Sequence, residues 1–149
     1  MFIILKDKKE IEINENIWKN YSSLINNLIN DYNKINEKLI VEEFEYITVL
    51  NIDKILNYKY NNKEKFSKVP KPMKENFIFD DYVSKYDANF FKYYDFEFNT
   101  NADNDLLQFI KCTNFFDINE LFELSCAKMA ELCREISPEK FKSFFLSNK

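Results

Sequence analysis

The sequence predicts a single domain of the α+β class, with a small three-stranded sheet and its helices first and a purely helical part after them. Two patterns support this class. Near the N-terminus, apolar and polar residues alternate as in half-buried strands, whereas from Asp105 onward apolar residues recur at helical spacing. With 149 residues, of which 46% are hydrophobic, the chain is long and apolar enough to bury one sizeable core.

A hairpin is expected at the N-terminus, between strands at residues 2–5 and 10–14. In the second strand, Ile11 and Ile13 alternate with polar neighbours, which is typical of a strand with one buried face. The turn at residues 7–9 contains no glycine, although tight hairpin turns often need a residue with positive φ. We therefore expect a turn of another type, or slight backbone strain.

Two helices, a third strand and another helix should follow. A short helix is expected at residues 15–20, and the next helix begins at a cap formed by Ser22 or Ser23. Its apolar face comprises Leu24, Ile25, Leu28, Ile29, Tyr32 and Ile35. Alternation in residues 42–48 predicts the third strand of the sheet. The helix after it has Leu50, Ile52, Ile55, Leu56 and Tyr58 at its apolar positions.

Residues 61–76 are expected to form a flexible basic linker loop. Pro70 and Pro72 disfavour both helix and central strand, and five lysines are spread along the segment. The segment is either a solvated linker or a basic contact or regulatory site, and its composition leaves both interpretations open. Beyond it, the acidic pair at residues 80–81 is expected to cap a helix, and the Asn-rich residues 95–103 to form a second loop.

Helices are expected to fill the rest of the chain. Apolar residues fall at helical spacing in two blocks, before and after a break at residues 114–117. Asp117 is the expected N-cap of the second block, because Glu120 stands three residues later, as in a capping box. Ser137 and Pro138 predict the start of a third helix.

Composition argues against several classes of enzyme. The chain contains neither glycine nor histidine, so it has no glycine-rich phosphate loop, no histidine base and no histidine-containing zinc site. The acidic pair at residues 80–81 has no recognisable catalytic partner, and residues 103–105 lack the glycine and the distal glutamate of a calcium loop. We therefore expect no catalytic residue, no metal and no cofactor.

Charge and cysteine content indicate the partners and the compartment. The net charge of −4 argues against a nucleic-acid partner, which usually requires a basic excess. Cys112, Cys126 and Cys133 are odd in number and form no C-x-x-C pair, so reduced, half-buried thiols are expected. The apolar residues 1–5 are too few for a secretory core or a membrane span. These features predict a cytoplasmic and nuclear protein that does not contact membranes.

The stretch 105–145 resembles a known family. The residues that carry the resemblance are Leu106, Phe109, Ile110, Cys112, Thr113, Asn114, Phe115, Phe116, Asp117, Ile118, Leu121, Ser125 and Cys126, followed by Ser137, Pro138, Glu139, Phe141, Phe144 and Phe145. In type and spacing they are similar to L-x-x-L-x-x-A-A-N-Y-L-D-I-x-x-L-x-x-x-T-C and T-P-E-E-I-R-x-x-F. These are motifs of the S-phase kinase-associated protein (Skp) family, the adaptors of SCF ubiquitin ligases.

The resemblance implies a BTB/POZ core with a helical C-terminal extension. Weaker matches at residues 22–29, 54–58 and 86–91 extend it toward the N-terminus, and the expected β-β-α-α-β-α order is that of the BTB/POZ core. Residues 1–112 would form this core, with the linker loop inside it, and residues 113–149 an F-box-binding type of extension. Compared with the family, this extension is expected to be truncated.

The resemblance also implies the partners and the residues that bind them. In the family, the Asn-Tyr motif lies at the contact with a cullin scaffold, which here implicates Asn114 and Phe115. The contact with F-box substrate receptors would involve Met129, Leu132, Ile136, Pro138, Phe141 and Phe144. Two alternatives remain: a self-associating BTB/POZ interaction module, with a homodimer when no partner is bound, and an elongin-C-like adaptor. The elongin-C-like family ends near the motif, whereas this chain continues.

The apolar content of the C-terminal helices supports a binding role independently. Their apolar side chains are more numerous than one covered face needs, so about half of them are expected to pack against the core. The rest would form a groove for an amphipathic helical partner.

Overall fold

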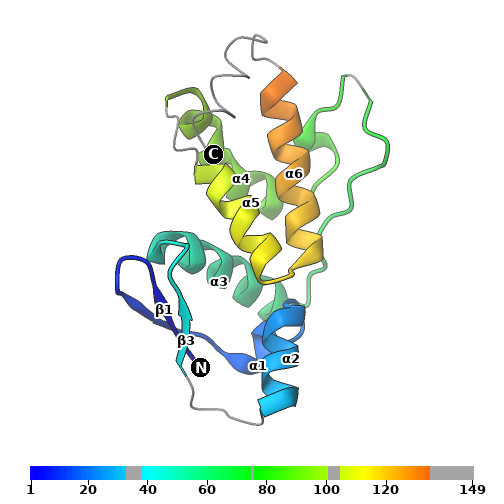
Figure 1. Ribbon diagram of the computed structural model, residues 1–149. Helices are drawn as coiled ribbons and strands as arrows, with labels where there is room; N and C mark the ends of the chain where they lie inside the picture. Colours follow the sequence, from blue (N-terminus) through cyan, green and yellow to red (C-terminus); the bar gives the residue numbers. More distant parts are fainter. Residues whose placement is uncertain (33–37, 75, 101–104, 135–149) are drawn as a thin grey trace.

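The computed structural model describes residues 1–32, 38–74, 76–100 and 105–134, and it confirms the mixed α+β class (Figure 1). A small sheet lies toward one end of the molecule. Its central strand is β1 (Phe2–Leu5), with β2 (Glu10–Glu12) antiparallel on one side and β3 (Lys38–Val41) parallel on the other. The expected β-β-α-α-β-α order is confirmed.

The sheet has one buried and one exposed face, because side chains alternate along each strand. Ile3 pairs with Ile11 and both are buried in the core. On the opposite face, Ile4 pairs with Ile40, and Ile40 is 63% exposed. The outer face therefore carries apolar side chains that the rest of the described chain leaves in solvent.

The hairpin turn contains no glycine, and a lysine takes the positive φ that such a turn requires. Lys8 has φ 62°, its N–H donates to the Leu5 carbonyl over 2.8 Å, and the Leu5 N–H donates to the Lys9 carbonyl over 2.9 Å. This is a three-residue loop whose last residue takes the left-handed conformation. Within the turn predicted at residues 7–9, Lys8 is the residue that takes the positive φ.

The first two helices begin at side-chain caps. Asn14 caps α1 (Glu15–Trp18) by accepting hydrogen bonds from the N–H groups of Asn16 and Ile17. Ser22 caps α2 (Ser23–Tyr32), since its hydroxyl accepts the Ile25 N–H over 3.1 Å. Of the two serines proposed from the sequence, Ser22 is therefore the cap. Ile35 of the predicted apolar face lies outside the described residues.

The third strand lies earlier than predicted. Residues 42–48, expected to be that strand, form a turn and the start of α3 (Tyr46–Asn61), whereas the strand itself is Lys38–Val41. The alternation in residues 42–48 was too short to decide the matter. Buried positions at Val49, Ile52 and Leu56 follow a helical period, and that longer pattern determines the local structure.

The middle of the chain corrects two further predictions. Asp80 and Asp81 do not cap a long helix; they belong to the one-turn helix η1 (Phe79–Asp81). The long helix α4 (Lys85–Thr100) instead has the hydroxyl of Ser84 bonded to the Asp87 N–H over 3.2 Å. The loop predicted at residues 95–103 is wrong for residues 95–100, which continue α4, because no proline or glycine interrupts the helix there. Residues 101–104 lie outside the described part.

Helix α5 (Asp105–Phe115) is the central element of the helical group, in contact with α3, α4 and α6 (Asn119–Arg134) (Figure 1). One cluster of buried residues runs from Ile3 in the sheet to Met129 in α6. The predicted division between residues 112 and 113 falls inside α5, so both parts share this core. None of the helices in the described residues has the length and apolar character needed to cross a membrane.

The basic segment after α3 is anchored at one end. Phe66 is 4% exposed and packs edge-on against Tyr21, and the Ser67 hydroxyl donates to Asp87 over 2.8 Å. The five lysines predicted to give the segment its charge are all exposed. Residues 64–67 are thus tied to the core, while the lysines face solvent.

Candidate protein-binding surfaces

The turn between α5 and α6 sets the geometry of the motif region. Asp117 has φ 54°, its N–H donates to the Asn114 carbonyl over 3.1 Å, and the Ile118 N–H donates to the Thr113 carbonyl over 2.9 Å. These two bonds define a Schellman C-cap. The prediction that Asp117 caps α6 is therefore wrong: Asp117 ends α5 in the left-handed conformation, and α6 begins two residues later at Asn119.

Two motif residues serve the interior. Phe116 is fully buried, with its ring edge-on to Trp18 at 5.2 Å between centroids, and Ile118 is 1% exposed. The carbonyl of Phe116 accepts a hydrogen bond from the buried hydroxyl of Ser22. The Ser23 N–H donates to the Asp117 carbonyl over 3.2 Å. The start of α2 thus fastens the α5–α6 turn in place.

The two residues assigned to the cullin contact face outward. Asn114 is exposed, and Phe115 is 37% exposed. One edge of the Phe115 ring packs on Phe44, at 5.7 Å between centroids. They border a shallow groove of about 420 Å³, whose lining residues are Glu43, Phe44, Gln108, Lys111, Asn114 and Phe115. The groove combines an aromatic floor with side chains of both charges at its rim.

The residues assigned to the F-box contact are only partly described. Met129 is 8% exposed and belongs to the core, and Leu132 is half-buried against it. Ile136, Pro138, Phe141 and Phe144 lie outside the described residues. Of the two described positions, Leu132 is the one with side-chain surface left for a partner.

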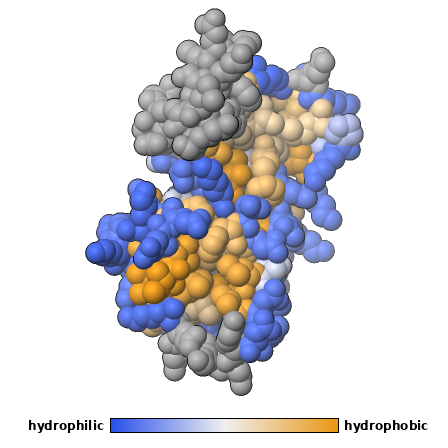
Figure 2. All heavy atoms as spheres, in the orientation of Figure 1, coloured by the Kyte–Doolittle hydropathy of each residue, from blue (hydrophilic) through white to orange (hydrophobic). Residues whose placement is uncertain are grey.

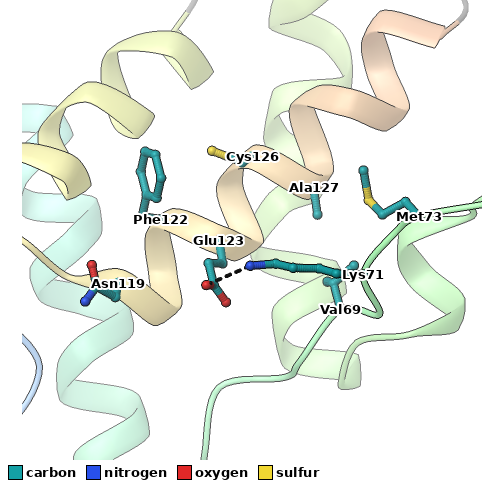
Figure 3. Close-up of a pocket in the computed structure, with 8 residues that line it drawn as sticks. All are labelled: Val69, Lys71, Met73, Asn119, Phe122, Glu123, Cys126 and Ala127. Atoms are coloured by element: carbon teal, nitrogen blue, oxygen red, sulfur yellow. Dashed lines mark hydrogen bonds and ion pairs between the residues drawn. The ribbon is translucent and has the colours of Figure 1, made fainter.

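Helix α6 presents a second groove that the sequence analysis did not single out (Figure 3). It has a volume of about 400 Å³ and lies between α6 and the basic segment, lined by Val69, Lys71, Met73, Asn119, Phe122, Glu123, Cys126 and Ala127. Lys71 reaches across it to Glu123, with 2.9 Å between Nζ and Oε1. The spacing of Phe122 and Cys126, one turn apart on the face opposite Leu121 and Leu124, was the available signal.

The far half of α6 fixes the chain that leads into η1. The Phe79 N–H donates to the Glu131 carboxylate, and Arg134 donates to the Phe77 carbonyl over 2.6 Å. Lys128, which is 3% exposed, pairs with Glu131 over 3.2 Å and lies over the Phe79 ring. The charged side chains of this half are engaged within the protein, so the groove that α6 offers to a partner lies in the half that carries Phe122 and Cys126, while Leu132 stays half-buried in the far half.

The thiols are poor candidates for chemistry. Burial raises the pKa of Cys112, Cys126 and Cys133, and the nearby Glu123 carboxylate raises that of Cys126 further. Thiols with raised pKa values stay protonated at neutral pH and react slowly. In the described part of the chain, no three His, Cys, Asp or Glu residues lie close enough to hold a metal ion.

Comparison of the sequence with models of known protein families gives no match, and comparison with characterised proteins gives no significant match. The assignment of partners therefore depends on the resemblance of the motif and on the geometry around it.

Proposed function

We propose that this protein is a non-catalytic adaptor with a BTB/POZ core, which joins a cullin scaffold to F-box substrate receptors in ubiquitin-dependent protein degradation. The observation that carries the proposal is that some residues of the motif are buried in the core while their neighbours are exposed. Phe116 and Ile118 are buried, whereas Asn114 and Phe115, the positions that the resemblance assigns to the cullin, are solvent-facing and border a groove.

The chemistry of the groove at Phe115 suits a helical partner. Its aromatic floor offers an anchor point for an apolar side chain, and Glu43 and Lys111 at the rim can pair with charges of either sign. A partly exposed aromatic ring that already packs on a neighbour loses little conformational freedom when it is covered.

The groove on α6 supports the second half of the proposal. Helix α6 follows the motif directly, as does the F-box-contacting part of the family, and Phe122 and Cys126 give it an apolar face. An elongin-C-like adaptor is the less favoured alternative, because that family ends near the motif and has no need of such a helix.

The proposal is tested by measuring the affinity of the purified protein for two probes, the N-terminal region of a cullin and an F-box peptide. Phe115→Ala should weaken cullin binding by about 2 kcal/mol, or roughly thirtyfold, as truncation of an aromatic anchor does. Phe122→Ala should weaken F-box binding and leave cullin binding unchanged.

Tyr60→Ala is the matched control, because Tyr60 is an aromatic residue of similar exposure, 43%, on α3 and away from both grooves. It should change neither affinity. A protein that binds neither probe, or whose cullin affinity is insensitive to Phe115→Ala, would refute the adaptor proposal.

A further inference from the structure

Strand β3 forms one edge of the sheet. The strand order is β2-β1-β3, so one side of β3 is bonded to β1 and its other side has no strand beside it in the described part of the chain. Backbone N–H and C=O groups on a free strand edge are a ready template for a further strand. Proteins usually protect such an edge with charges or proline at its centre.

The centre of this edge is apolar instead. Ile40 is 63% exposed, the most exposed of the large apolar side chains described, and Ile4 and Phe2 lie beside it on the outer face of the sheet. Figure 2 shows apolar residues gathered over the sheet and bordered by polar ones. An apolar patch on a free edge is an aggregation hazard unless something covers it.

The charges at the two ends of the strand indicate what covers it. Lys38 stands at the start of β3, and Glu42 follows its last residue; both are exposed. If two β3 strands run antiparallel with Ile40 facing Ile40, then Leu39 stands opposite Val41. Carried one residue past the strand, into the turn where Glu42 lies, the same register brings Glu42 of the second copy close to Lys38. An edge with opposite charges at its ends is complementary to itself under a twofold axis.

We propose that β3 is a self-association edge, through which two copies of this chain pair antiparallel about Ile40 to form a continuous six-stranded sheet. The interface is isologous, with the Ile40 side chains on the axis and two Lys38–Glu42 pairs beside it. The inference does not depend on the cullin proposal, because it uses a different surface from the groove at Phe115.

The dimer should be weak. Each copy contributes one four-residue strand and a few outer-face side chains, which is less than a stable interface normally buries. We therefore expect a reversible monomer–dimer equilibrium that sedimentation velocity resolves between about 1 µM and about 1 mM, the range in which small interfaces dissociate.

The first test is at the axis. Ile40→Lys places two like charges opposite each other, and the association constant should fall roughly tenfold or more. Ile47→Lys, at an isoleucine that is 54% exposed on α3, is the matched control and should leave it unchanged. Both variants should retain the unfolding free energy of the parent, since both side chains are in solvent.

The second test is a charge swap that reports on the register. Lys38→Glu and Glu42→Lys should each weaken dimerisation several-fold, and the double variant should restore it. Lys38 also pairs with Glu10 of its own chain over 3.0 Å, so Glu10→Gln serves as the control that removes this pair without touching the edge. Glu10→Gln should leave the dimer intact.

Three results would overturn the proposal. One is a protein that stays monomeric throughout the concentration series. Another is a dimer that Ile40→Lys does not weaken but Phe115→Ala does, which would put the interface on the groove at Phe115. The third is a double charge variant no better than the single ones, which would mean that β3 pairs with something other than its own copy in this register.

Discussion

A buried ion pair in the core is expected to make a large contribution to stability. Lys59 near the end of α3 and Asp87 in the first turn of α4 are both fully buried, with 2.8 Å between Nζ and Oδ1. Asp87 also accepts hydrogen bonds from the Ser67 N–H and hydroxyl. Lys59 contacts the Glu64 carboxylate over 2.9 Å. One ammonium thus connects α3, the basic segment and α4.

Asp87→Asn should lower the unfolding free energy, although Lys59 keeps the Glu64 carboxylate at 2.9 Å. Lys59→Met should lower it more, by about 3–5 kcal/mol, because the Asp87 carboxylate is then buried without a cation beside it. For a domain whose total stability is typically about 5–15 kcal/mol, this is a large fraction. The double variant should lose less than the sum of the two single losses, since it removes both charges together. The coupling should be at least about 1 kcal/mol.

The measurement is urea-induced unfolding followed by circular dichroism, with the complete cycle of single and double variants. The control is Lys38→Met. The Lys38–Glu10 pair has nearly the same separation, 3.0 Å, but its side chains are 56% and 42% exposed. That change should cost less than about 1 kcal/mol. A loss below this level at both Lys59 and Asp87, or strict additivity in the cycle, would show that the pair is not held as described.

Three further predictions follow from single residues. Lys63 follows the C-cap residue of α3 and has φ 51°, so Lys63→Gly should raise the unfolding free energy by about 1 kcal/mol in urea unfolding, whereas Lys63→Ala should not. Ser22→Ala removes the cap of α2 and the donor to a buried carbonyl, and should cost about 2–3 kcal/mol in the same assay; Ser23→Ala should cost much less. The hydrogen bond from Lys59 lowers the pKa of Glu64 below its ordinary value of 4.5, so the stability it contributes is present above that pH and is lost as pH falls through the lower folded-state pKa. Glu64→Gln should flatten this acid dependence in unfolding measured across pH, and an unchanged slope would contradict the pairing.

Several features of the fold could be read from the sequence because they depend on short-range chemistry. The alternation around Ile11 marks a real strand, and Ser22 caps the helix that it precedes. The break at residues 114–117 falls where α5 ends and the turn to α6 begins. In each case the pattern and the structure involve the same few neighbouring residues, so no distant contact was needed to interpret them.

The errors arose where a distant contact or an unusual backbone conformation decides the outcome. Residues 42–48 alternate like a strand, but the sheet position beside β1 is taken by Lys38–Val41. Asp117 resembles an N-cap in sequence, yet its φ of 54° makes it the end of α5, a position that usually holds glycine. A chain without glycine must use other residues at such positions, and the usual signal for a helix end is then missing.

The candidate site shows the same limit more sharply. The helical pattern of α6 alone does not distinguish Met129 from Phe122 as a residue that could contact a partner. Packing separates them, because Met129 turns into the core while Phe122 lines the groove with Lys71 and Met73, residues about fifty positions earlier. The relation between α6 and that segment is a property of the tertiary fold, and no local pattern contains it.

Adjacent residues of the motif have different roles, because Phe116 packs in the core and Phe115 is partly exposed. Binding can therefore be tested separately from folding. Phe116 is held by Trp18 and by the Ser22 hydroxyl, so a change there disturbs the core and the start of α2 together. Phe115 packs edge-on against Phe44 and Phe116 but is itself 37% exposed, so its truncation leaves the contacts of Phe116 with Trp18 and Ser22 in place. A binding defect from Phe115→Ala in a stably folded protein therefore reports on the partner surface itself, whereas the same defect from a change at Phe116 would say only that the turn presenting Phe115 had moved.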